Sequence, residues 1–149
     1  MGMRYLISFL FGVIGCCVMS AAGSVSVVKP GIETLRDNGF ELLKGKRVGL
    51  ITNPTGVDND LKSTIDILHE APGVNLVALF APEHGVRGDI PAGQKVAVAK
   101  DAVTGVKVHS LYGATRRPTA EMLKDVDVLV YDIQDNGCRS YTFISTMGL

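Results

Sequence analysis

The segment APEHGVRGD, residues 81–89, concentrates ionisable side chains within a few positions. They are Glu83, His84, Arg87 and Asp89. The segment directly follows the apolar run VNLVALF at 74–80, which is typical of a buried strand. Carboxyl, imidazole and guanidinium groups transfer protons and bind anions in enzymes, so their gathering at a strand end predicts a chemical site.

Polar residues also follow two other apolar runs that we expect to be strands. The run RVGLIT at 47–52 leads into Asn53, and the run VDVLVYD at 126–132 ends in Asp132. Further polar residues after the second of these runs are Gln134, Asp135 and Arg139. In an open parallel α/β sheet, ligands bind outside the carboxyl ends of the strands. We therefore expect Asn53, Glu83 and Asp132 to face one crevice.

Carboxylate chemistry is the most specific expectation for these residues. A carboxyl group that is partly desolvated at a strand end, as expected for Glu83, keeps its proton more readily and can act as a general acid. Asp132 or Asp135 would supply a second carboxylate, which a neighbouring Arg139 would keep ionised. A structural alternative fits the same residues equally well. In that alternative Asp132 caps the following helix and Glu83 pairs with Arg87.

Motifs for the common cofactors are missing from the sequence. No G-x-G-x-x-G follows an expected strand, and GFELLKGKR at 39–47 differs from a P-loop in spacing and precedes a strand. His69, His84 and His109 lack metal-ligand spacing, so we expect neither a metal nor a cofactor. The 15 Lys and Arg residues equal the 15 Asp and Glu residues, which leaves no basic excess for binding nucleic acid.

The alternation of apolar runs and amphipathic segments predicts the fold class. Expected strands cover 47–52, 74–80, 106–111 and 126–132. Expected helices cover 60–70 and 119–125, two short helical pieces precede the first strand, and a small hairpin at 94–99 interrupts a long loop at 84–105. Strands that are apolar on both faces belong to a parallel sheet with helices on both sides. We therefore predict one α/β domain with an open, mainly parallel sheet.

The N-terminus has the three-part order of an export signal. A single positive charge at Arg4 precedes an apolar stretch, and the small residues SAAGS follow it. The strongly apolar part is shorter than the about 20 residues of a membrane helix. We predict a signal peptide at 1–22 and an exported protein, periplasmic or extracellular. A lipoprotein is the alternative, because VIGC at 13–16 resembles a lipobox in which Cys16 would carry the lipid.

Removal of that signal would leave Cys138 as the one cysteine of the mature chain, so no internal disulfide is expected. Cys138 beside Arg139 could be a nucleophile. A small, semi-buried residue after Gly137 is the more common explanation.

Several longer motifs resemble one bacterial family, the exo-β-N-acetylmuramidases, formerly a domain of unknown function. They are GLITNPTGVD, STIDIL, VNLVALFAPEHGVRGD, AGQKV, TGVKVHSLYG and TRRPTAEMLKDVDVLVYDIQDNGCRSYTFISTM. The resemblance extends in order from about residue 31 to residue 149. Its most specific parts are PEHG-x-RGD and DVLV-x-DIQD, which are not general α/β signatures.

The resemblance implies a secreted glycoside hydrolase that releases terminal N-acetylmuramic acid from the non-reducing end of peptidoglycan fragments. Residues 23–149 would form its Rossmann-like N-terminal catalytic domain, and a further C-terminal domain would be absent from this chain. Glu83 is the position carried over as the catalytic acid, with Asp132 as the second carboxylate. Expected substrate-binding residues are Asn53, His84, Arg87, Gln134, Asp135, Arg139 and Tyr141.

The expected partners are muropeptides derived from peptidoglycan, with no protein partner predicted. A competing interpretation is a sugar-binding or scaffold fragment of the cell envelope that does not turn over its ligand. A chain that lacks the family's C-terminal part could behave in this way.

Overall fold

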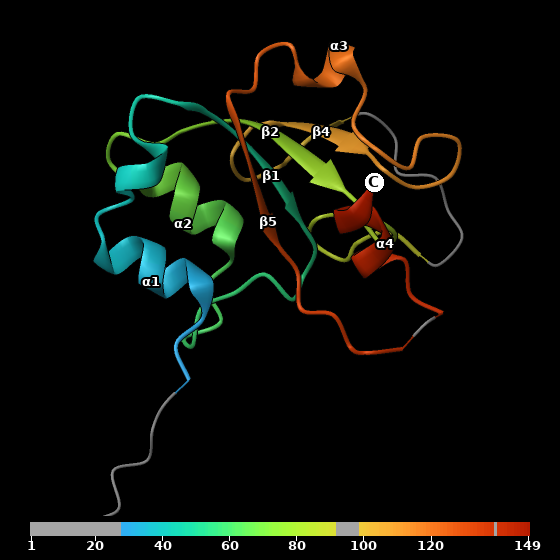
Figure 1. Cartoon of the computed structure of the whole chain (residues 1–149), viewed down its shortest axis with the longest axis horizontal. Helices are drawn as coiled ribbons and strands as arrows, with labels where there is room; N and C mark the ends of the chain where they lie inside the picture. The colour runs from blue at the N-terminus through green and yellow to red at the C-terminus, as the bar shows by residue number, and fades with distance from the viewer. Residues whose placement is uncertain (1–27, 92–98, 139) are drawn as a thin grey trace, which may run out of the picture.

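The computed structural model describes residues 28–91, 99–138 and 140–149. The described strands are β1 Arg47–Thr52, β2 Asn75–Ala81, β3 Ala99–Lys100, β4 Lys107–Ser110 and β5 Val128–Asp132. They form one sheet in the order β3-β4-β2-β1-β5 (Figure 1). The four strands expected from the sequence are thus confirmed, with ends that differ by one or two residues.

The sheet is parallel except at one edge. β1 pairs in parallel with β2 and β5, and β2 pairs in parallel with β4. The short β3 pairs with β4 in the antiparallel direction, within a segment that we expected to be a loop. The hairpin expected at 94–99 lies almost wholly outside the described residues. Parallel pairing brings the carboxyl ends of β1, β2, β4 and β5 to the same edge of the sheet.

Helices cover both faces of the sheet, which confirms the predicted α/β class. Their bounds are α1 Gly31–Asp37, the 3-10 helix η1 Glu41–Leu43, α2 Thr64–Glu70, α3 Ala120–Leu123 and α4 Phe143–Gly148. Figure 1 shows α1 and α2 together on one side of the strands, and α3 and α4 on the other.

Each face of the sheet has its own apolar cluster. The cluster beneath α1 and α2 includes Ile65 and Leu68 of α2, which are 1% and 0% exposed, and Leu79 of β2. The cluster on the opposite face is built around Phe80, with Met122 of α3 packed against it. The first cluster is the larger and carries most of the core.

Helix α2 begins later than the sequence predicted. The expected helix covered 60–70, but Asp58 accepts backbone hydrogen bonds from Asp60 and Lys62 at 3.0 and 2.8 Å and holds these residues in a loop. Ser63 then caps the helix by accepting the Ile65 amide at 3.2 Å. Leu61, which lies within the expected helix, is consequently in this loop and 80% exposed.

The predicted signal peptide and the alternative lipid site at Cys16 lie outside the described residues. Within the described ranges, no helix has the length and apolar character needed to span a membrane.

Candidate active site

The carboxyl edge of the sheet carries the residues that we predicted to meet there. Asn53 follows β1, Glu83 follows β2 by two residues, and Asp132 ends β5. Thr52 pairs in register with Asp132, which places Asn53 beside it. The expectation that polar strand ends lie at one edge is therefore confirmed.

The expectation that these side chains face one crevice is wrong for the described structure. Glu83 lines a cavity of about 610 Å³ together with residues of α4. Asp132 lines a separate cavity of about 430 Å³ with Gln134, and its carboxylate accepts a hydrogen bond from Thr64, the first residue of α2. Because α2 and α4 cover opposite faces of the sheet, the two carboxylates point to different sides of the same edge.

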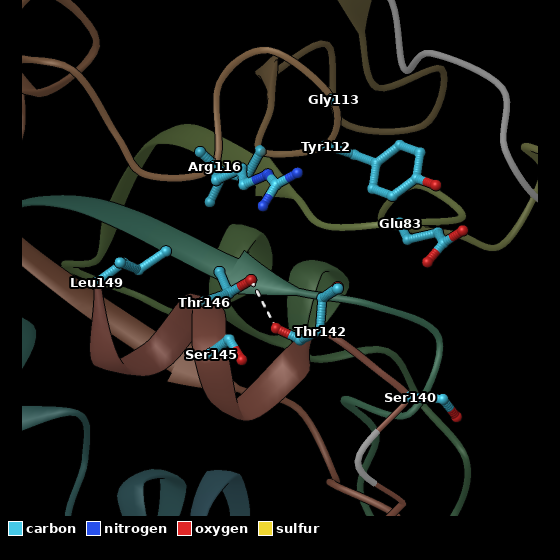
Figure 2. A pocket seen from close by; sticks show the side chains of 10 residues that line it. Glu83, Tyr112, Gly113, Arg116, Ser140, Thr142, Ser145, Thr146 and Leu149 are labelled. Carbon is cyan, nitrogen blue, oxygen red and sulfur yellow. Dashed lines mark hydrogen bonds between the residues drawn. The ribbon is translucent and has the colours of Figure 1, made fainter.

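We call the larger space the Glu83 cavity. It is lined by Glu83, Leu111, Tyr112, Gly113, Arg116, Ser140, Thr142, Ser145, Thr146 and Leu149. Figure 2 shows Glu83 and Tyr112 on one wall and the hydroxyl side chains of α4 on the other. Its volume lies within the range of typical ligand pockets, about 300 to 1,000 Å³. Among the described residues its lining combines hydroxyl groups with one carboxylate and one guanidinium group.

Glu83 is half-buried, and its polar neighbour in the cavity is Tyr112. Hydrogen bonding to the Glu83 carboxylate raises the pKa of the Tyr112 phenol above its usual value. Burial acts in the same direction, and the positive charge of Arg116 opposes it. Glu83, Tyr112 and Arg116 therefore form one electrostatically coupled group, although Glu83 follows β2 and the other two follow β4.

Asn53 and Gln134 belong to a hydrogen-bond chain that joins the loops after β1 and β5. The Asn53 side chain accepts from the amide and hydroxyl of Thr55 at 2.9 and 2.6 Å. That hydroxyl in turn accepts the Gln134 amide at 2.8 Å. Asn53 is 5% exposed, so in this chain it shapes the turn behind the Asp132 side of the edge.

Arg87 lies away from the Glu83 cavity, in a set of ion pairs that we call the Arg87 network. It contacts Asp101 at 2.5 and 2.9 Å and Asp66 at 2.8 Å. Asp101 also accepts the amide and hydroxyl of Thr104. Its side chain is only 2% exposed.

This network settles the structural alternative considered for the motif. Arg87 pairs with the two aspartates and not with Glu83. Hydrogen bonding to Arg87 holds the pKa of Asp101 well below its usual range, against the opposing effect of burial. Likewise, Asp132 caps no following helix, because its carboxylate binds Thr64 and α4 begins only at Phe143.

His84 has a left-handed backbone with φ of 73°, and the following Gly85 has φ of 80°. The His84 Nδ1 atom lies 3.3 Å from the carbonyl oxygen of Ile90. The two consecutive left-handed residues turn the chain sharply between Glu83 and Arg87. This turn is the local reason why the two side chains point to different places.

The remaining predicted residues follow β5. Asp135 is exposed and accepts the Gly137 amide at 2.7 Å. Tyr141 is 41% exposed, and its ring centroid lies 5.6 Å from that of Phe143. Arg139 lies outside the described residues.

Cys138 is exposed, so the expectation of a semi-buried residue is wrong. Its sulfur lies 3.0 Å from the Ser140 hydroxyl, and this hydrogen bond lowers the pKa of the thiol. Among the residues that the structure describes, no group of three or more His, Cys, Asp or Glu side chains could hold a metal ion.

Two kinds of cavity residue were missed by the sequence reasoning. Tyr112 and Arg116 follow β4, a parallel strand after which the sequence analysis predicted no site residue. The signal was present in LYGATRR at 111–117. The hydroxyl residues of α4 were also missed, because the segment carrying them has no strand end to mark it.

Comparison with known proteins bears on this edge of the sheet. The family described as "Exo-beta-N-acetylmuramidase NamZ, N-terminal" matches residues 48–149. The peptidoglycan β-N-acetylmuramidase NamZ of Bacillus subtilis (strain 168) is 59% identical over 120 residues, which is 80% of this chain and 29% of that protein.

Two solved structures of DUF1343 family proteins from Bacteroides fragilis NCTC 9343 share the fold. The first is 70% identical with a TM-score of 0.73, covering 80% of this chain and 29% of the other. The second is 38% identical with a TM-score of 0.65, covering 82% and 30%. The chain thus spans less than a third of the length of these relatives. Because the family match covers most of the chain, the protein belongs to the exo-β-N-acetylmuramidase NamZ N-terminal family.

Proposed function

We propose that this chain provides the catalytic acid of a glycoside hydrolase that releases terminal N-acetylmuramic acid from the non-reducing end of peptidoglycan fragments. The observation that carries the proposal is the position of Glu83. Its half-buried carboxyl group faces a cavity of about 610 Å³ and pairs with no arginine or lysine among the described residues. The membership of the NamZ family and the activity named for the Bacillus subtilis relative support the substrate class.

The chemistry follows from the bond that must break. A glycosidic oxygen leaves poorly as an alkoxide, so a carboxylic acid within hydrogen-bond distance must donate a proton to it. Glu83 would donate this proton to the sugar bound in the cavity. Tyr112 is placed to orient the Glu83 carboxyl group, because the two side chains interact on the same wall.

A second carboxylate would act on the anomeric carbon or on a water molecule. Asp132 lines a separate cavity and its carboxylate accepts a hydrogen bond from Thr64, so we do not assign it this role. The separation of the two carboxyl groups decides the stereochemical outcome. About 5 to 5.5 Å allows a covalent intermediate and retention, whereas about 6.5 to 9.5 Å admits a water molecule and gives inversion.

Turnover of a muramide tests the proposal. The protein expressed from its complete reading frame should release 4-nitrophenol and free N-acetylmuramic acid from 4-nitrophenyl β-N-acetylmuramide. It should also release N-acetylmuramic acid from glycan fragments that carry this sugar at the non-reducing end. Binding of these compounds without product would instead support the non-catalytic sugar-binding interpretation.

We also propose export of the protein, on the basis of the N-terminal residue order described above. The intact mass of protein from the cell envelope or medium should show loss of residues 1–22, or of 1–15 if Cys16 is lipidated. A full-length species confined to the cytoplasm would contradict export.

A further inference from the structure

Among the described arginines, Arg116 and Arg117 form no ion pair, and of these two only Arg116 lines the Glu83 cavity. Arg36, Arg47 and Arg87 each form an ion pair with an aspartate. Within the described residues, Arg116 forms no such pair, and it lines the Glu83 cavity. Figure 2 shows its guanidinium group directed into the space between Tyr112 and α4.

The charge of Arg116 acts on another residue that lines this cavity. It acts on the neighbouring Tyr112 phenol in the opposite direction to Glu83. Arg116 is exposed in the unliganded chain, so water now solvates its guanidinium group. A bound ligand that displaces this water would need to offer an anion in return, because an uncompensated charge is costly to desolvate.

The substrate class proposed above carries a suitable anion. N-acetylmuramic acid differs from N-acetylglucosamine by a lactyl ether whose carboxylate projects from the sugar ring. The planar fork of an arginine matches a carboxylate in a bidentate arrangement. The same cavity thus contains an acid for the glycosidic oxygen and a cation for the carboxylate that distinguishes the sugar.

We propose that Arg116 binds the lactyl carboxylate of N-acetylmuramic acid and thereby sets the specificity of the Glu83 cavity for muramic acid over N-acetylglucosamine. This inference rests on the proposed function. It makes Arg116 a substrate-binding residue that determines specificity, and not a group that transfers a proton.

Three chromogenic substrates separate the possible roles of Arg116. They are the 4-nitrophenyl β-glycosides of N-acetylmuramic acid, of its lactyl methylamide and of N-acetylglucosamine. The wild-type protein should prefer the free acid. Arg116→Ala should lower kcat/KM for the free acid on the order of 10- to 100-fold, as expected for a hydrogen-bonded charge pair. The other two substrates should change little, so that the preference disappears.

Matched variants control the experiment. Arg117→Ala removes the same charge from the adjacent residue, which does not line the cavity, and should retain the preference. Arg116→Lys keeps the charge but loses the bidentate fork, so its loss should be smaller than that of alanine. Since Arg116 is exposed, the thermal midpoint should stay unchanged in all three variants.

Equal loss on all three substrates would overturn the proposal, because it would mean that Arg116 acts through Glu83. Unchanged kinetics would overturn it as well. If the wild-type protein hydrolyses none of the substrates, the proposed function fails, and calorimetric binding of free N-acetylmuramic acid then tests Arg116 separately. That binding should weaken in Arg116→Ala and not in Arg117→Ala, and equal binding by the wild type and both variants would refute the role.

Discussion

Glu83 of the cavity and Arg87 of the network belong to the same nine-residue segment, 81–89, but their charges have opposite uses. In the network, Arg87 is held by Asp66 and by a carboxylate that is 2% exposed, Asp101. In the cavity, Glu83 and Arg116 face open space, and neither forms an ion pair among the described residues. Charges that satisfy one another stabilise a fold, whereas charges left facing a cavity are available to a ligand.

The largest expected effect on stability comes from breaking the Arg87 network. Asp101→Asn removes the buried negative charge and leaves Arg87 with Asp66 alone. We expect the free energy of unfolding to fall by about 3 kcal/mol, since the buried Asp101 loses charge-assisted hydrogen bonds to Arg87 and an asparagine NH2 group cannot accept the hydrogen bonds that both carboxylate oxygens accept. Asp127→Asn, at the exposed pair with Arg47, should cost much less. Urea unfolding of both variants measures the two losses of stability. Equal losses would contradict the expected difference between the buried Asp101 and the exposed Asp127.

The pH dependence of this loss gives a sharper test. The pKa of Asp101 is lowered in the folded state, so its contribution is fully present above the unfolded pKa of about 3.9 and is lost as pH falls through the folded pKa. The stability gap between wild type and Asp101→Asn should thus be constant from about pH 7 to 5 and shrink below about pH 4. A gap that widens in acid would rule out this account.

A smaller effect is expected at Gly88, which lies just after Arg87. Its φ is 75°, and a Cβ atom there would approach the Cγ atom of Pro54 to 2.7 Å. Gly88→Ala should lose about 1 to 3 kcal/mol of stability, from backbone strain and this contact. Gly105→Ala shares the positive φ of 71° but meets nothing within 4 Å, so it should lose less. Equal losses would show that the Pro54 contact contributes nothing.

The smallest effect concerns the interaction between Glu83 and Tyr112 in the Glu83 cavity. Because hydrogen bonding to Glu83 raises the pKa of Tyr112, Glu83→Gln should let the phenol ionise at lower pH. NMR titration of ring-labelled tyrosine, assigned with Tyr112→Phe, measures this shift. Tyr131 should titrate as in the wild type, since burial and Asp135 raise its pKa. An unchanged Tyr112 titration would mean that the two side chains do not interact.

The strands and the edge that bears the site were predictable because both depend on local apolar pattern and parallel pairing. The sequence did not predict on which face of that edge each polar side chain lies. Arg87 pairs with Asp66 and Asp101, which lie 21 and 14 residues away in the sequence. A local sequence pattern does not reveal such long-range pairs. The Asp132 carboxylate likewise points away from Glu83 because it binds the hydroxyl of Thr64, which lies 68 residues away in the sequence.

Tyr112 and Arg116 could have been found by extending one rule. The predicted site residues follow the other three long apolar runs, and the carboxyl end of β4 lies at the same edge of the sheet as theirs. The loop after it was therefore an equally strong candidate. The wall formed by α4 is different, because its position over the sheet depends on packing such as the Tyr131 hydroxyl donating to the Phe143 carbonyl at 2.8 Å.

The central claim is that Glu83 donates a proton to the leaving group, and Glu83→Gln with two leaving groups tests it most directly. Glutamine keeps the shape but has no proton to give. On a muramic acid disaccharide, kcat should fall on the order of 10² to 10⁴-fold. On the 4-nitrophenyl glycoside it should fall less, because a nitrophenolate leaves without protonation. The thermal midpoint should match that of Glu70→Gln, an exposed control at the end of α2. Near-normal turnover of the disaccharide, or activity lost only in step with folding, would contradict the account.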